Sequence, residues 1–172
     1  MRIPAFFTAL TIGVSSFAQQ LGAFTDFEKK FFIFDQGTFR QLEFQPVKSF
    51  GIGDHCVAYV TDGDYLKAYA NHLSYDVSPT VTSYIVTNQI VCFQIGTQLY
   101  SFENGQKNLL SKFIGKYQAN DSLIAFFDTE NRYFLVYYNY KTFQLEDGII
   151  YRDDQLFKTG TNLLAYVDAF QN

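Results

Sequence analysis

Several residue types that build common functional sites are scarce in this sequence. Its 172 residues include two histidines, two cysteines, three prolines, one methionine and no tryptophan. His55 and His72 have no further histidine or cysteine at ligand spacing, so we expect no structural zinc site. Lysine and arginine are dispersed and the net charge is −4, which argues against a nucleic-acid partner. No nucleophile elbow, phosphate loop or dinucleotide fingerprint occurs, so the sequence assigns no catalytic residue.

Aromatic side chains, by contrast, are abundant. Hydrophobic residues make up 48% of the chain and aromatic residues 19%, with 20 Phe and 13 Tyr. Such a chain is too apolar to be disordered and can build a packed core. Because Phe and Tyr favour the half-buried surface of a sheet, the composition favours β-strands.

The N-terminus has the pattern of a secretory signal peptide. Arg2 supplies a positive charge, Ala5–Val14 is a short apolar run, and Ser16–Ala18 places small residues at a cleavage site. We therefore expect residues 1–18 to be a signal peptide and residues 19–172 to form one exported β-repeat domain. Its destination would be the periplasm, the cell surface or the extracellular space. A membrane anchor or a buried first strand are the alternatives, although the run is short for a membrane span.

No stretch after the signal approaches about 20 apolar residues, so we expect no transmembrane segment. Two cysteines follow the signal, Cys56 and Cys92. Export would permit a disulfide between them. They fall on adjacent repeat units at different heights, and a bond requires Cα atoms within about 7 Å. A disulfide and two buried free thiols are both open at this stage.

A short apolar phrase recurs along the chain at intervals of 33 to 40 residues. A period of this size indicates a supersecondary unit that is stacked several times. Each copy follows a turn of Gly, Asn and Asp and is short, as expected of a strand that is buried on both faces. The copies are Ala23–Asp26, Ala58–Val60, Cys92–Gln94, Ala125–Asp128 and Ala165–Asp168.

A second strand follows each apolar run and forms a β-hairpin with it. After a further turn, Phe39–Glu43 and Phe143–Glu146 predict a third strand. More polar segments at 47–50, 81–84 and 155–158 lead into the next unit and are interpreted as a short fourth strand. Residues 108–117 also carry apolar side chains at helical spacing, so a helix is an alternative there. The second strands are expected at 31–34, 65–69, 99–102 and 133–138.

A unit of about 35 residues with three or four short strands resembles a blade of a β-propeller. We therefore predict an all-β chain of tandem antiparallel β-meander repeats. It would form a partial β-propeller of about four blades plus the start of a fifth. The apolar run is expected to be the innermost strand, because neighbouring blades would pack on both of its faces.

The C-terminal end of the repeat admits two interpretations. The ring is incomplete, which we favour, or the last strand closes it with the N-terminal unit. Over residues 21–172 the chain resembles secreted bacterial β-propeller-like repeat proteins, without the terminal Trp-Asp or the Gly-His pair of WD40 repeats. An open array exposes apolar faces at its ends, so we also expect self-association.

Two groups of residues are candidates for a ligand site. Tyrosines on the second strands and their turns could stack on sugars or peptides, although packing between blades also explains them. Carboxylates in the hairpin turns could ligate calcium, although turns favour Asp in any case. The tyrosines are Tyr69, Tyr100, Tyr138 and Tyr140, and the calcium candidates are Asp62, Asp64 and Asp128.

These observations favour a non-catalytic role. The leading hypothesis is an exported scaffold or protein-interaction module with a protein or cell-surface partner. A lectin-like propeller that binds glycans is the alternative. A hydrolase is less favoured, because it needs two carboxylates about 5 to 9.5 Å apart. No cofactor other than calcium is suggested.

Overall fold

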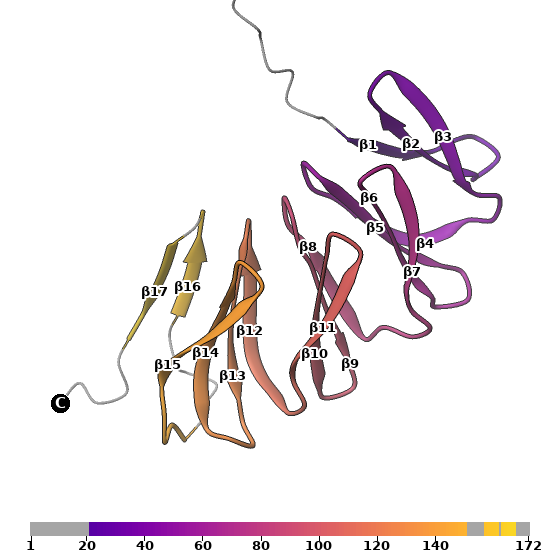
Figure 1. Cartoon of the computed structure of the whole chain (residues 1–172). Coiled ribbons are helices and arrows are strands. Elements are labelled where there is room, and N and C mark those ends of the chain that lie inside the picture. Colours follow the sequence, from indigo (N-terminus) through magenta and orange to yellow (C-terminus); the bar gives the residue numbers. More distant parts are fainter. Residues whose placement is uncertain (1–20, 151–156, 162, 168–172) are drawn as a thin grey trace, which may run out of the picture.

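The chain is built from strands alone in the part that the structure describes. The computed structural model describes residues 21–150, 157–161 and 163–167, and these form seventeen antiparallel strands in five sheets (Figure 1). Sheet 1 contains β1 (Gly22–Thr25), β2 (Phe31–Asp35) and β3 (Thr38–Glu43). Sheet 2 contains β4 (Val47–Ile52), β5 (Cys56–Thr61), β6 (Leu66–Ala70) and β7 (Leu73–Ser78).

The remaining strands continue the same pattern. Sheet 3 contains β8 (Ser83–Val86), β9 (Val91–Ile95), β10 (Gln98–Glu103) and β11 (Gln106–Ser111). Sheet 4 contains β12 (Ile114–Asn120), β13 (Leu123–Asp128), β14 (Tyr133–Tyr138) and β15 (Lys141–Glu146). Sheet 5 contains β16 (Phe157–Gly160) and β17 (Leu163–Tyr166). The sheets follow one another along an open curve (Figure 1).

The predicted all-β architecture of repeated meanders is confirmed. Within each sheet the strands pair antiparallel in chain order. The alternative helix at 108–117 is absent, because that segment lies in β11 and β12 and in the connection between them. The residues in β11 alternate between exposed and more buried positions, as a strand requires.

The position predicted for the Ala-aromatic strand is corrected. This strand is the second of each four-stranded sheet and pairs on both sides, as β5 does with β4 and β6. The polar lead-in segments are the first strands of the following sheet. Among neighbouring sheets, β4 lies close to β8 and β12 lies close to β16, so these first strands face the inside of the curve. A strand there is covered less completely than the second strand, which explains its more polar sequence.

The core lies between the sheets rather than within one central layer. Val57 and Tyr59 of β5 pack with residues of sheet 1, whereas Ala58 and Val60 pack with residues of sheet 3. Successive side chains of a strand point to opposite faces, so one apolar strand supplies two interfaces. This explains why the second strands β5 and β13 are almost entirely buried.

A β-bulge recurs at the same place in the last strand pair of sheets 1 to 4. In sheet 2, Leu66 pairs with Ser78 and Lys67 pairs with Asp76, which leaves Val77 as the extra residue. An extra residue increases the local twist and turns an additional side chain towards the core. Aliphatic residues occupy this position in all four sheets, namely Leu42, Val77, Leu110 and Leu145.

Cys56 and Cys92 are buried free thiols. Cys56 belongs to the core cluster between sheets 2 and 3, and Cys92 to the cluster between sheets 3 and 4. The two side chains therefore point into different interfaces. A disulfide requires Cβ vectors that point at each other. Of the two alternatives that the sequence left open, the structure therefore has two buried free thiols.

The outer face of sheet 1 carries exposed aromatic side chains. Phe24 stacks on Phe32 with ring centroids 5.5 Å apart, and Phe34 lies 5.0 Å from Phe39. Phe39 is 65% exposed. Self-association through such a face stays a prediction of the sequence. The expected signal peptide, residues 1–18, lies outside the described residues.

Candidate functional site

One edge of the array gathers the turns that join the first strand to the second and the third to the fourth. We call this edge the turn edge; its members in sheets 1 to 4 are residues 36–37, 53–55, 71–72, 87–90, 104–105, 121–122 and 139–140. Antiparallel pairing places both kinds of turn at the same end of a sheet. The turn edge therefore runs across neighbouring sheets.

The turns at 36–37, 71–72, 104–105 and 139–140 share one backbone conformation. Each joins two strands through two residues that both have positive φ, for example 49° at Asn104 and 81° at Gly105. This is the type I′ geometry, whose twist matches that of the flanking strands. Asn followed by Gly is the preferred sequence for this turn.

Two of these turns carry a large side chain where the others have glycine. His72 and Tyr140 have φ of 63° and 60°, at the position that Gly37 and Gly105 occupy in the other sheets. A residue with a Cβ is disfavoured there by about 1 to 2 kcal/mol. Both side chains reach the preceding sheet: His72 Nδ1 lies 2.6 Å from Asp35 Oδ2. The Tyr140 hydroxyl accepts a hydrogen bond from the Asn104 side chain.

Polar contacts join successive turns along the turn edge. Asn71 Nδ2 donates to Asn104 Oδ1 across 3.2 Å, between sheets 2 and 3. Asn88 Nδ2 donates to Asp121 Oδ1 across 2.8 Å, between sheets 3 and 4. The backbone N–H of His55 also donates to the Asn88 carbonyl at 3.0 Å. These contacts give the edge a fixed arrangement of amide, imidazole and carboxylate groups.

Just below the turns, a tyrosine of one sheet faces an acid of the preceding sheet. The Tyr69 hydroxyl donates to Asp35 Oδ2 at 2.7 Å, and the Tyr137 hydroxyl donates to Glu103 Oε2 at 3.5 Å. Asp35 ends β2 and Glu103 ends β10, and these strands lead into the equivalent turns at 36–37 and 104–105. At the interface between sheets 2 and 3, Ala70 takes the position of the acid and Phe102 the position of the tyrosine. Both are apolar and lie in the same core cluster.

The surroundings of the two acids shift their pKa values in opposite directions. Burial would raise the pKa of Asp35, but hydrogen bonds from Tyr69 and His72 and nearby positive charges lower it below the usual value. Burial raises the pKa of Glu103, and the hydrogen bonds from Tyr137 and Tyr140 do not offset it. Glu103 is 7% exposed. It is therefore a buried carboxylate with weak compensation.

Two polar cavities open on the turn edge on either side of Glu103. One, of about 180 Å³, lies between sheets 2 and 3 and is lined in part by His55, Asn71 and Asn104. The other, of about 220 Å³, lies between sheets 3 and 4 and is lined by Ser122, Tyr138 and Asn139 together with the shared residues. Gln89 and Glu103 line both.

The comparison with protein families agrees with this arrangement of like sheets. Residues 15–172 match the family described as the 10-bladed beta propeller domain. The chain belongs to this family. A comparison with curated proteins gives no match.

Solved structures similar to this propeller include human WBSCR16 and the N-terminal domain of Nup159. The first has 8% identity and a TM-score of 0.43, over 69% of this chain and 45% of that chain. The second has 11% identity and a TM-score of 0.43, over 72% of this chain and 40% of that chain. The propeller chain thus spans less than half the length of either protein.

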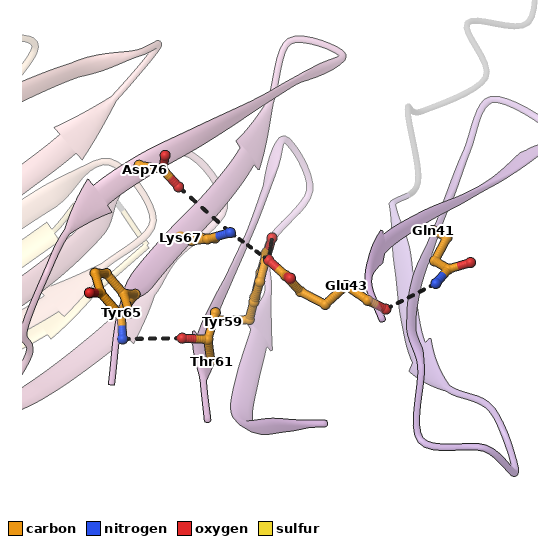
Figure 2. A network of polar contacts seen from close by, with 7 residues as sticks. All are labelled: Gln41, Glu43, Tyr59, Thr61, Tyr65, Lys67 and Asp76. Carbon is orange, nitrogen blue, oxygen red and sulfur yellow. Dashed lines mark hydrogen bonds and ion pairs between the residues drawn. The ribbon is translucent and has the colours of Figure 1, made fainter. Parts of the chain in front are cut away.

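A second polar network joins sheets 1 and 2 of the propeller below the level of the turn edge (Figure 2). Glu43 Oε1 accepts hydrogen bonds from the Tyr59 hydroxyl at 3.1 Å and from Lys67 Nζ at 2.7 Å. Lys67 Nζ also lies 3.7 Å from Asp76 Oδ1. The hydrogen bond and charge of Glu43 raise the pKa of Lys67, against the effect of burial.

Lys67 and Asp76 also line a groove of about 420 Å³ on the outer strands β6 and β7. Its other lining residues include Tyr65 and Pro79. Lys67 is held between two carboxylates, so its charge is largely neutralised by the protein itself. The network therefore acts as a cross-link between two sheets, and the Lys67 ammonium is already paired within it.

The candidate tyrosines do not gather into one site. Tyr69 is 2% exposed and packs between sheets 1 and 2, and Tyr100 stacks on Phe93 with ring centroids 5.3 Å apart. Tyr100 also packs against the core cluster that sheets 2 and 3 share, so core packing accounts for these two. Tyr138 and Tyr140 are 47% and 45% exposed and lie at the turn edge of sheet 4.

The candidate calcium ligands are in separate sheets. Asp64 pairs with Lys48 at 2.7 Å, and Asp62 lies in the same exposed turn. Asp128 accepts hydrogen bonds from the Asn131 backbone N–H at 2.8 Å and from the Ser111 hydroxyl at 2.9 Å. In the described ranges no three His, Cys, Asp or Glu side chains gather as a metal site would require. Calcium binding stays a prediction.

Sequence reasoning missed Glu103, Asp35 and Gln89 as site residues. The signal that could have found the acids is positional: each stands immediately before a two-residue turn, Asp35 12 residues after Ala23 and Glu103 11 residues after Cys92. Their partners could not be read in the same way, because Tyr69 and Tyr137 belong to the next sheet. Across the described ranges, no helix is long and apolar enough to cross a membrane.

Proposed function

We propose that this propeller is an exported, non-catalytic module that binds a protein partner along its turn edge. The observation that carries the proposal is the continuity of this edge across sheets 2, 3 and 4. Amide side chains such as Asn71 and Asn104 are held in fixed positions by contacts between sheets. Turns presented side by side on a rigid array offer an extended surface, as repeat architectures do for partner binding.

The polar groups of the turn edge are directed at one another and at two small open cavities. Such a surface suits an extended polypeptide that makes many modest hydrogen bonds. The role of a scaffold follows if separate segments of one partner, or two partners, occupy different turns.

Site-specific photo-crosslinking in cells that produce the protein tests this proposal. A photoreactive amino acid at Asn71 or Asn139 lies on the turn edge, whereas the matched positions Asp62 and Glu130 lie in exposed turns at the opposite edge. We expect the same discrete crosslinked partner from both turn-edge positions and none from the opposite edge. Equal crosslinking from all four positions, or none from any, would contradict the proposal.

Export is proposed from the pattern of residues 1–18. Expression of the full chain with a C-terminal tag, followed by N-terminal sequencing, should yield a mature protein that begins at Gln19. An Ala18→Tyr variant, with a bulky side chain at the cleavage position, should retain the uncleaved N-terminus. Recovery of the uncleaved wild-type chain from the cytoplasm would refute export.

Glycan binding is a second candidate, favoured by the exposure of Tyr138 and Tyr140 on the turn edge. Aromatic rings of this kind can stack on sugar faces. The candidate is weaker than protein binding because the corresponding residues in sheet 2, Ala70 and His72, are not tyrosines. A glycan array with no ligands for the wild-type chain would exclude it.

A further inference from the structure

Glu103 is a buried acid that opens onto two cavities. It ends β10 at the centre of the described array, with one cavity on each side. The Tyr137 hydroxyl, at 3.5 Å, is a long hydrogen-bond donor to it. A carboxylate that is 93% removed from solvent normally has close donors or a cation beside it.

Asp35 has closer partners at the equivalent position, although its second carboxylate oxygen, Oδ1, is buried without a hydrogen bond. Tyr69 and His72 donate to or lie beside Asp35 Oδ2 at 2.7 and 2.6 Å. In sheet 4 the residue that corresponds to His72 is Tyr140, whose hydroxyl accepts a hydrogen bond from Asn104 and donates one to Glu103. Glu103 thus receives hydrogen bonds from two tyrosine hydroxyls, those of Tyr137 and Tyr140. Glu103 therefore lacks the close nitrogen partner that Asp35 has.

The groups around Glu103 can hold a cation and offer none of their own. His55, Asn71, Gln89 and Asn104 line the first cavity with amide and imidazole groups. Among the described residues that line either cavity there is no lysine or arginine. Gln89 is exposed, so the cavities can be reached from solvent.

We propose that Glu103 binds the ammonium or guanidinium group of a lysine or arginine side chain on the partner protein, with Gln89 and Asn104 as hydrogen-bonding neighbours. This inference rests on the proposed function and names the chemistry of the partner at the turn edge. A basic side chain would place a nitrogen beside Glu103, as His72 Nδ1 lies beside Asp35. The net charge of −4 on the chain favours the approach of a basic segment.

Titration of the full chain with short capped peptides, followed by NMR, tests the proposal. The probes are acetyl-Gly-Lys-Gly-amide, its arginine analogue and the neutral norleucine analogue. We expect saturable shifts of the Gln89 and Asn104 side-chain amides with the two basic peptides and none with the neutral one. Glu103→Gln should weaken binding about tenfold, the cost of removing one charge-assisted hydrogen bond.

Two further variants keep the outcome decisive. Asp35→Asn changes the same net charge at the equivalent position of sheet 1 and should leave peptide binding unchanged. Gln89→Glu, an exposed substitution that should not disturb folding, should tighten binding of both basic peptides. The proposal is wrong if Glu103→Gln and Asp35→Asn have equal effects, or if no basic peptide saturates.

The result also separates this inference from the proposed function. Discrete crosslinks from Asn71 and Asn139 with no binding of basic peptides would refute the role of Glu103 and leave the proposed function standing. Loss of both would remove the turn edge as an interaction surface. Peptide binding without a crosslinked partner would support the site and contradict the role proposed for it.

Discussion

The Tyr69 hydroxyl donates a 2.7 Å hydrogen bond to the Asp35 carboxylate across the boundary between sheets 2 and 1. At the equivalent positions of sheets 4 and 3, the Tyr137 hydroxyl donates to Glu103 at 3.5 Å. Between them, Phe102 and Ala70 meet in an apolar contact cluster. Successive interfaces of the array are thus fastened in different ways by equivalent positions.

The difference in length between these two hydrogen bonds predicts different effects of tyrosine substitution. Tyr69→Phe removes a short bond to a buried acid, and we expect it to lower the free energy of unfolding by about 1 to 3 kcal/mol. Tyr137→Phe removes a long bond and should cost less than about 1 kcal/mol. Urea unfolding of both variants measures this. Equal losses would show that the two pairs are equivalent in solution.

The two acids should contribute to stability with opposite pH dependence. The pKa of Asp35 is lowered in the folded state, so its contribution is present above its usual value of 3.8 and is lost as the pH falls. The pKa of Glu103 is raised, so its contribution is present below its usual value of 4.5 and is lost as the pH rises.

At neutral pH we therefore expect Asp35→Asn to be less stable than the wild type and Glu103→Gln to be more stable. The Glu103→Gln difference should shrink as the pH falls towards 4.5, and the Asp35→Asn difference should shrink only as the pH falls below 3.8. Thermal unfolding from pH 3 to pH 8 measures this. Differences of the same sign for both variants at neutral pH would contradict the assignment.

His72 and Tyr140, which have positive φ in the turns at 71–72 and 139–140, provide a second matched pair of variants. Tyr140→Gly relieves the strain of a φ of 60° and loses the hydrogen bonds of a half-exposed hydroxyl with Asn104 and Glu103, so the two effects should offset each other to within about 1 kcal/mol. His72→Gly relieves the same strain but loses the contact with Asp35, so its net effect should be destabilising. Chemical unfolding separates the two. A gain in stability from His72→Gly would show that the Asp35 contact contributes little.

Gly53 is required by the close approach of two sheets. A Cβ at this position would lie 1.9 Å from the Thr87 carbonyl oxygen, which is backbone and cannot move away cheaply. We expect Gly53→Ala to lower the free energy of unfolding by at least about 1 to 3 kcal/mol. Gly160→Ala, whose Cβ would meet its nearest neighbour at 3.9 Å, is the control and should change stability little.

Calcium should not contribute to stability through the turn carboxylates. Asp64 is paired with Lys48, and Asp128 accepts hydrogen bonds from its own turn and from Ser111. We expect the melting temperature to be unchanged between excess calcium and excess chelator. A rise of several degrees with calcium would show that these acids rearrange to bind the ion.

The sequence alone determined the repeated β-meander, because strand alternation and turn chemistry are local and recur with the period of the unit. Hydrophobic pattern placed β5, β9 and β13 correctly as buried strands. The same pattern wrongly predicted that they are the innermost strands. An innermost strand and the second strand of a stacked sheet are both buried on two faces, so their hydrophobic patterns are alike.

Only the tertiary structure decided which side chains meet across sheets. Cys56 and Cys92 lie in the second strands of neighbouring sheets but face different interfaces, and Glu103 and Asp35 share a position but have different neighbours. Each such pairing joins residues from neighbouring units, and its geometry depends on how one sheet packs against the next. The periodic sequence specifies the unit, whereas the packing between units creates the partners, the cavities and the weakly compensated acid of the turn edge.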